Sequence, residues 1–297
     1  MMTPPTENLK LLTRSPLWAI LPGRLDLIVA GILNGQLMSA DWQAAKPSTE
    51  YKGQHKIAII PIQGVLSKDG PAWLGSNYDT IADAAEKAAA DPAVKRVVLS
   101  VDSPGGEVLG LPETAAVLAR VAKVKPVSAM IEGTAASAAY WLTSQANDIS
   151  ITPSAEVGSV GVRMMHADIS KMLDNQGIKI TELYSGKFKN EWSPFKPLSD
   201  DAVGDMQSRL AEAHNDFITG VANGRGNRAS AEMKRSRFGE GRMFGADKAV
   251  SHGLVDKIQT GREFYRSIVP AEEAPKAPVH VGFGLQRARI DIERAKI

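Results

Sequence analysis

Short apolar runs alternate with helical patterns through the middle of the chain, and this alternation constrains the fold more than any other feature. Four runs rich in β-branched residues are typical of buried strands, at residues 57–62, 97–101, 126–131 and 149–151. Three segments with apolar residues at helical spacing lie between them, at residues 78–90, 112–121 and 135–145. Strands that alternate with helices in this way predict right-handed βαβ crossovers, a mainly parallel sheet and the α/β fold class.

The second half of the chain predicts a more irregular set of elements. We expect helices over residues 168–175 and 246–253 and short strands over 180–184 and 254–258. Ser199 is placed to cap a long helix that reaches about residue 222, and Asp200 and Asp201 in its first turn favour the helix dipole. The expected organisation is therefore an N-terminal arm over 1–50, one folded domain over 51–260 and a flexible C-terminal tail over 261–297.

Composition excludes several classes of protein and of site. Of the 297 residues, 43% are hydrophobic and 23% charged, which is ordinary for a globular protein, and a net charge of +2 gives no global attraction to nucleic acid or anionic lipid. The absence of cysteine excludes disulfides, thiol catalysis and cysteine-ligated zinc. The five histidines are scattered without a metal-binding pair, so we expect no metal and no cofactor.

The N-terminal segment carries no signal peptide pattern, and its most apolar stretch does not suffice to span a membrane. Residues 17–33 are interrupted by Pro22, Arg24 and Asp26. Apolar residues of this stretch, at positions 18, 20, 21, 25, 27, 28 and 32, predict an amphipathic docking helix. We therefore expect a soluble protein with a cytoplasmic location.

Two loops follow predicted strands, where parallel sheets place their sites. Asp102-Ser103-Pro104-Gly105-Gly106 can turn backbone N–H groups toward an oxyanion, or it can be a tight turn. Ser137, in Gly133-Thr134-Ala135-Ala136-Ser137-Ala138, stands at a strand-to-helix turn that a substrate can approach closely, or it fills a crowded helix–sheet contact. The residues by themselves leave both alternatives open.

A third loop, Ser185-Gly186-Lys187-Phe188-Lys189-Asn190-Glu191-Trp192, sets lysines between aromatic residues. Burial there would lower the pKa of a lysine and allow it to act as a base. A solvated lysine is the alternative interpretation.

These motifs occur in one order, together with Gly158-Ser159-Val160-Gly161-Val162 and the closing run 249–256. In this the chain resembles the signal peptide peptidase A family of serine–lysine peptidases, within the ClpP/crotonase-like superfamily, over about residues 55–258. The resemblance implies a spiral core of repeated β-β-α units and a serine peptidase domain over 51–260. Alanines follow the serine where the family often has glycine, which concerns substrate preference more than catalysis.

The resemblance also assigns roles to individual residues. Ser137 matches the nucleophile and Lys189 the general base, with Lys187 as the choice if the alignment slips. Ser159 matches the serine that orients the lysine. The oxyanion-hole residues it implies are Gly105, Gly106 and Ala138.

Pro16-Leu17-Trp18-Ala19-Ile20 and the lack of an anchor resemble the bacteriophage head-maturation branch of the family. The resemblance then implies a homo-oligomer that cleaves scaffold, capsid or portal proteins and itself, in the host cytoplasm or the prohead. The alternatives are a cytoplasmic bacterial peptidase of the same family, a non-catalytic capsid or scaffold protein, and a crotonase-type acyl-CoA enzyme. The basic segment 225–242 holds six Lys/Arg and two acidic residues, and we interpret it as a solvated loop rather than a DNA contact.

Overall fold

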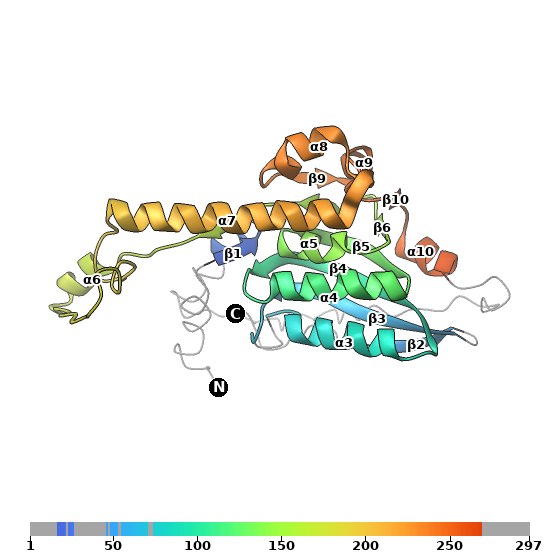
Figure 1. The fold of residues 1–297 in the computed structure, drawn as a ribbon, viewed down its shortest axis with the longest axis horizontal. Helices are drawn as coiled ribbons and strands as arrows, with labels where there is room; N and C mark the ends of the chain where they lie inside the picture. Colours follow the sequence, from blue (N-terminus) through green and yellow to red (C-terminus); the bar gives the residue numbers. More distant parts are fainter. Residues whose placement is uncertain are drawn as a thin grey trace, which may run out of the picture.

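The computed structural model describes residues 17–21, 23–26, 46, 48–52, 55–70 and 74–268 (Figure 1). The strands in this part of the chain are β1 (Leu17–Ile20), β2 (Ser48–Lys52), β3 (His55–Leu66), β4 (Val94–Glu107), β5 (Val127–Ala136), β6 (Asp148–Ile151), β7 (Glu156–Gly158), β8 (Arg163–Met164), β9 (Met243–Gly245) and β10 (Lys257–Ile258). The helices there are α3 (Tyr78–Ala90), α4 (Leu111–Val124), α5 (Ala138–Ser144), α6 (Ser170–Asn175), α7 (Asp200–Arg225), α8 (Ala231–Arg235), α9 (Ala246–Ser251) and α10 (Gly261–Ile268), with 3₁₀ turns η1 (Gly226–Arg228) and η2 (Arg237–Gly239).

The strands join in one sheet whose centre is parallel, as the alternating pattern predicts. β3, β4, β5, β6 and β10 lie side by side in this order and run in the same direction. Helices α3, α4 and α5 pack on one face and enclose the main core, whereas Phe264 of α10 packs on the other face against Ile57, Val98 and Met130 (Figure 1). The predicted α/β fold class is confirmed.

Local sequence signals set the helix boundaries. The Asn77 side chain accepts hydrogen bonds from the backbone N–H groups of Asp79 and Thr80, which caps α3. The helix ends at Asp91, which precedes proline and is therefore held in extended backbone. Ser199 accepts a hydrogen bond from the Ala202 N–H at the start of α7, so the predicted cap is confirmed.

The long helix α7 packs its C-terminal half on α5. The rings of Trp141 and Phe217 stack with their centroids 5.0 Å apart. Gly220 lets the two helices approach at this contact, because a Cβ there would lie 2.1 Å from the Trp141 Nε1 atom. The N-terminal half of α7 continues past the edge of the sheet toward α6 (Figure 1).

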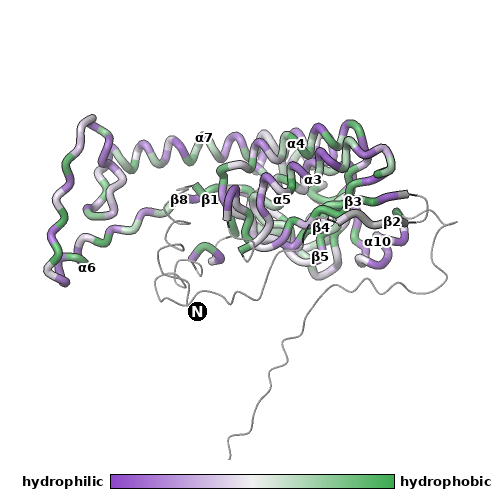
Figure 2. The backbone as a smooth tube through the Cα atoms, turned by 90° about the horizontal axis from the view of Figure 1, so that it is seen from below, coloured by the Kyte–Doolittle hydropathy of each residue, from purple (hydrophilic) through white to green (hydrophobic). Residues whose placement is uncertain are grey.

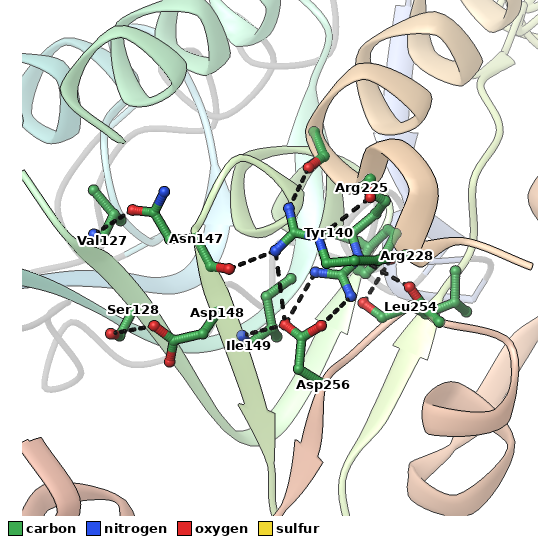
Figure 3. A network of polar contacts seen from close by, with 12 residues as sticks. Val127, Ser128, Tyr140, Asn147, Asp148, Ile149, Arg225, Arg228, Leu254 and Asp256 are labelled. Atoms are coloured by element: carbon green, nitrogen blue, oxygen red, sulfur yellow. Dashed lines mark hydrogen bonds and ion pairs between the residues drawn. The ribbon is translucent and has the colours of Figure 1, made fainter. Parts of the chain in front are cut away.

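A buried ion pair joins the end of α7 to the strand edge (Figure 3). Arg225, which is fully buried, donates to both carboxylate oxygens of Asp256 at 2.7 and 3.2 Å and to the Gly253 carbonyl at 2.9 Å. Asp256 also accepts from the Ile149 N–H of β6 at 2.8 Å. The Tyr140 hydroxyl of α5 donates to the neighbouring Leu254 carbonyl, so the network connects α5, α7 and β6.

The helix predicted around Trp18 is wrong over Leu17–Ile20. Leu17–Ile20 form strand β1, and a single helical turn covers residues 24–26. Pairing with two strands that are distant in the sequence overrides the local helical spacing. The remainder of the apolar stretch, from residue 27 to 33, lies outside the described residues.

Three other predictions need correction. Ala135 and Ala136 belong to β5, so α5 begins at Ala138 rather than at Ala135. Residues 180–184 are not a strand, because no neighbouring strand pairs with them. The tail expected after Thr260 instead begins with α10, whose Phe264 is buried; residues 269–297 lie outside the described part.

Candidate functional site

Ser137 stands at a sharp turn between β5 and α5. Its backbone has φ 55° and ψ −122°, a left-handed conformation that costs a non-glycine residue about 1–3 kcal/mol. The Ser137 N–H donates to the Gly158 carbonyl at 2.8 Å, and its hydroxyl donates to the Gly161 carbonyl at 3.3 Å. Strain of this kind presents a hydroxyl at the head of a helix, as in nucleophile turns of hydrolases.

The loop that carries Ser159 wraps around Ser137. Strand β7 pairs in parallel with the end of β5 and brings the loop to the turn. Ser159 is 3% exposed and has φ 54°, and its N–H donates to the Arg242 carbonyl at 2.8 Å. The structure therefore brings Ser137 and the Ser159 loop together.

Gly105 lies directly beside Ser137. Its φ is +96°, and a Cβ built on it would lie 2.3 Å from the Ala19 carbonyl oxygen and 3.0 Å from the Ser137 Cβ. Glycine is required at this close approach of three backbone segments. In this structure the Gly105 N–H donates to the Ser103 hydroxyl at 3.1 Å, so this donor is engaged within its own loop.

Gly106 and Ala138 complete the set of predicted oxyanion-hole residues. A Cβ on Gly106 would lie 1.8 Å from the Leu66 carbonyl oxygen of β3, so no other residue fits there. Ala138 is fully buried as the first residue of α5, directly after Ser137. The small side chain at this position allows the helix to start against the sheet.

Lys187 and Lys189 are exposed and lie away from this turn. They belong to residues 165–198, a segment between β8 and α7 that we name the lateral arm; it contains α6 and extends beyond the sheet (Figure 2). Both lysines line an open hollow of about 750 Å³, together with Trp192, Asp201 and Arg209 among others. Ser137 and Lys189 share no hydrogen bond in the described part of the chain, so this single chain does not assemble the pair.

Glu182 holds the lysine loop in shape. Its carboxylate accepts hydrogen bonds from Asn190 at 2.9 Å and from the Ser193 hydroxyl at 2.8 Å. These hydrogen bonds lower the pKa of Glu182, so the carboxylate stays ionised. The loop that presents Lys189 is thus closed by its own side chains.

No motif pointed to His214, which α7 brings to the Ser159 loop. Its imidazole donates to the Val160 carbonyl, and its buried Nε2 atom has no hydrogen-bond partner among the described residues. Burial, and then the charge of Arg237, lower the pKa of His214. A neutral imidazole is therefore favoured beside the site.

No metal centre is evident in the described ranges, where no three His, Cys, Asp or Glu side chains gather. Within those same ranges, no helix has the length and apolar character needed to cross a membrane.

Comparison with known families decides the relationship. Residues 119–273, from α4 past α10, match the model of peptidase family S49. The chain belongs to peptidase family S49. This confirms the family that the ordered motifs predict.

Two phage proteins are among the similar S49 relatives. The capsid assembly protease C of Escherichia phage lambda is 29% identical over 82% of this chain and 56% of its own length. The head-tail preconnector protein GP5 of Enterobacteria phage P21 is 31% identical over 72% of this chain and 42% of its own length. This chain thus spans about half the length of these relatives.

Among solved structures, an enoyl-CoA hydratase/isomerase family protein from Silicibacter pomeroyi aligns with 75% of this chain and 78% of its own, at 13% identity and a TM-score of 0.47.

Proposed function

We propose that the chain is a serine endopeptidase in which Ser137 is the nucleophile and Lys189 the general base. The observation that carries this proposal is the strained turn that sets Ser137 between Gly105 and the Ser159 loop. A buried serine in a left-handed conformation has no evident packing purpose, whereas acyl transfer requires a hydroxyl presented at such a turn.

The chemistry follows from these positions. The Lys189 amine takes the proton of the Ser137 hydroxyl while the Oγ atom attacks the carbonyl carbon of a peptide bond. The Gly106 and Ala138 amides stabilise the tetrahedral oxyanion, at about 3 kcal/mol for each donor. Lys189 gives its proton to the leaving amine, and water then hydrolyses the acyl-enzyme. Ser159 orients the lysine.

A second copy of the chain supplies Lys189 in this proposal. The lateral arm carries seven exposed large apolar residues: Met165, Met172, Ile178, Ile180, Leu183, Tyr184 and Phe188. Leu183 is 94% exposed, and so much apolar surface on one projecting segment marks an interaction site. Docking of the lateral arm on a neighbouring copy would cover this surface and bring its lysine to the neighbour's Ser137.

The substrates proposed are capsid, scaffold or portal polypeptides and the chain itself. Support comes from the names of the two phage relatives, which concern capsid assembly and the head–tail connection. Processing inside an assembling particle would also place many copies side by side, as the shared site requires.

The test uses four proteins incubated with casein and analysed by intact-mass spectrometry: wild type, Ser137→Ala, Lys189→Ala and Lys187→Ala. We expect Ser137→Ala and Lys189→Ala each to lose at least a hundredfold in cleavage, while Lys187→Ala, the matched control, stays within about threefold of wild type. Full activity of Lys189→Ala would reject it as the base. A mixture of the two inactive variants regains part of the activity if Ser137 and Lys189 come from different copies, and stays inactive if they come from one.

A further inference from the structure

Strand β1 fills a slot beside the candidate nucleophile. It lies between β4 and β8 and is antiparallel to both, with Ala19 facing Gly106 and Trp18 facing Arg163 (Figure 2). On its β4 side it pairs with residues 105–107, the segment that holds two of the candidate oxyanion-hole residues. A short segment from the N-terminal part of the chain therefore sits inside the site.

The slot exists because β5 leaves β4. The two central strands pair up to Ser103 and Ala135, and β5 then turns toward β7. Beyond that point β1 takes the free edge of β4, and β8 closes the opposite side. Without β1, both flanking strands would present unpaired backbone groups, which is the geometry that binds an extended peptide.

The carbonyl groups of β1 pass next to Ser137. The Ala19 oxygen and the Ser137 Cβ both lie within 3.0 Å of the position that a Cβ on Gly105 would occupy. The Leu17 carbonyl accepts from the Val108 N–H at 3.1 Å, and the Leu21 N–H donates to the Pro104 carbonyl at 2.7 Å. By the alternation of an antiparallel ladder, Ala19 stands at the hydrogen-bonding pair between these two.

Side chains fasten β1 in place. Trp18 and Ile20 are each 3% exposed and pack with Leu25, Val65 and Leu74. An ion pair of 2.9 Å between Asp26 and Arg163 ties the following turn to β8. The strand thus places large Trp18 and Ile20 on one face and small Ala19 on the other. A bound peptide could be held by the same kind of contacts.

We propose that β1 is an internal occupant of the peptide-binding groove, and that it keeps polypeptides from Ser137 until it is displaced. The inference rests on the proposed function for its effect on cleavage, although the binding of a peptide to the groove can be measured without it. The segment also indicates the class of substrate: an extended strand with bulky apolar residues on either side of a small one. Because β1 is tethered, its high effective concentration excludes weaker competitors.

A release variant tests the proposal. Trp18→Ser combined with Ile20→Ser removes the buried anchors, and Val124→Ser, at a residue 70% exposed on α4, is the matched control. We expect the release variant to cleave casein at least tenfold faster than wild type and the control to match wild type. Thermal unfolding followed by circular dichroism establishes that the variants are folded. If wild type cleaves casein, an unchanged rate in a folded release variant would overturn the proposal.

If the release variant does not fold, an engineered disulfide between β1 and β8, which we name the lock, tests the proposal instead. Leu17 and Met164 face each other across β1 and β8, and the chain contains no other cysteine to interfere when both become Cys. We introduce this pair into the wild-type chain, with Leu17→Cys alone as the control for oxidant and reductant. The oxidised lock should cleave at least tenfold more slowly than the reduced form, and equal rates would contradict the proposal.

Peptide binding separates this inference from the proposed function. A fluorescent peptide with the sequence of residues 16–21 is titrated by anisotropy against proteins that also carry Ser137→Ala. We expect the peptide to bind most tightly to the release variant, less tightly to the reduced lock, in which β1 still competes, and at least tenfold more weakly to the oxidised lock than to the reduced lock. If nothing is ever cleaved but this difference holds, the groove proposal stands and the peptidase proposal fails. Equal binding in all forms overturns the groove proposal whatever the activity.

Discussion

The Arg225–Asp256 ion pair allows a prediction whose size follows from burial. Arg225 is fully buried, whereas the Asp256 side chain is 23% exposed. Removing one partner of a buried pair leaves an uncompensated charge and costs about 3–5 kcal/mol. Asp256→Leu leaves the Arg225 guanidinium buried without its carboxylate partner and away from solvent, so we expect a loss of about 4 kcal/mol in the free energy of unfolding. Arg225→Met leaves the Asp256 carboxylate partly exposed to solvent and still hydrogen-bonded to the Ile149 N–H. We therefore expect a smaller loss, of about 3 kcal/mol in the free energy of unfolding.

The double variant decides whether this reasoning holds. With both charges gone, we expect a loss of about 1–2 kcal/mol, smaller than either single loss, because no charge is left unpaired and only the Ile149 N–H and the Gly253 carbonyl lose a partner. Urea unfolding followed by tryptophan fluorescence measures all four proteins. Additive losses, or a greater loss for Arg225→Met than for Asp256→Leu, would refute the argument from burial.

The same pair fixes a pH dependence. Burial raises the pKa of Asp256, but the hydrogen bonds and charge of Arg225 outweigh it and hold the pKa below the usual 3.8. The stability from this depressed pKa is present above about pH 4 and is lost as the pH falls below 3.8. The difference between wild type and Asp256→Leu should therefore shrink at pH 3. A constant difference from pH 7 to pH 3 would contradict the assigned cause.

Two further predictions concern the site and its surroundings. Gly106→Ala should lose cleavage and several kcal/mol in the free energy of unfolding, because its Cβ would meet the Leu66 carbonyl oxygen at 1.8 Å. At Gly161 the atom nearest to an added Cβ is 3.8 Å away, so Gly161→Ala is the control and should stay folded in thermal unfolding followed by circular dichroism. Burial, and then the charge of Asp102, raise the pKa of Glu132 above 4.5. Its charged form is thus disfavoured in the folded state, and stability is lost as the pH rises through that pKa. Glu132→Gln should raise the melting temperature at pH 7 and leave it unchanged near pH 3; an equal shift at both would exclude titration as the cause.

Local and repeated signals made much of the core predictable. The helix over 78–90 is predicted to the residue, because Asn77 caps it and Asp91 precedes a proline. The parallel strands are identifiable as uninterrupted apolar runs, since both of their faces are covered. Ser137 could be proposed because it follows a predicted strand, whereas Ser159 could be proposed only from the resemblance of its motif to the family.

Pairings between distant segments were not predictable in this way. Leu17–Ile20 has apolar spacing that suits a helix, yet it becomes a strand because β4 and β8 offer it two edges. Residues 180–184 have strand-forming composition, but no strand among the described residues pairs with them. The residues of a segment do not indicate whether a strand edge will be available to pair with it, because strand formation depends on the neighbouring strands in the folded chain.

The sequence by itself determined the α/β alternation, the caps and the motifs of family S49, because these depend on neighbours within a few residues. The tertiary structure decided which groups meet: that the Ser159 loop and Gly105 surround Ser137, that the lateral arm with Lys189 stands apart from them, and that β1 lies between β4 and β8 (Figure 1). These contacts join residues far apart in the chain, and their formation depends on the whole packed fold rather than on any local preference.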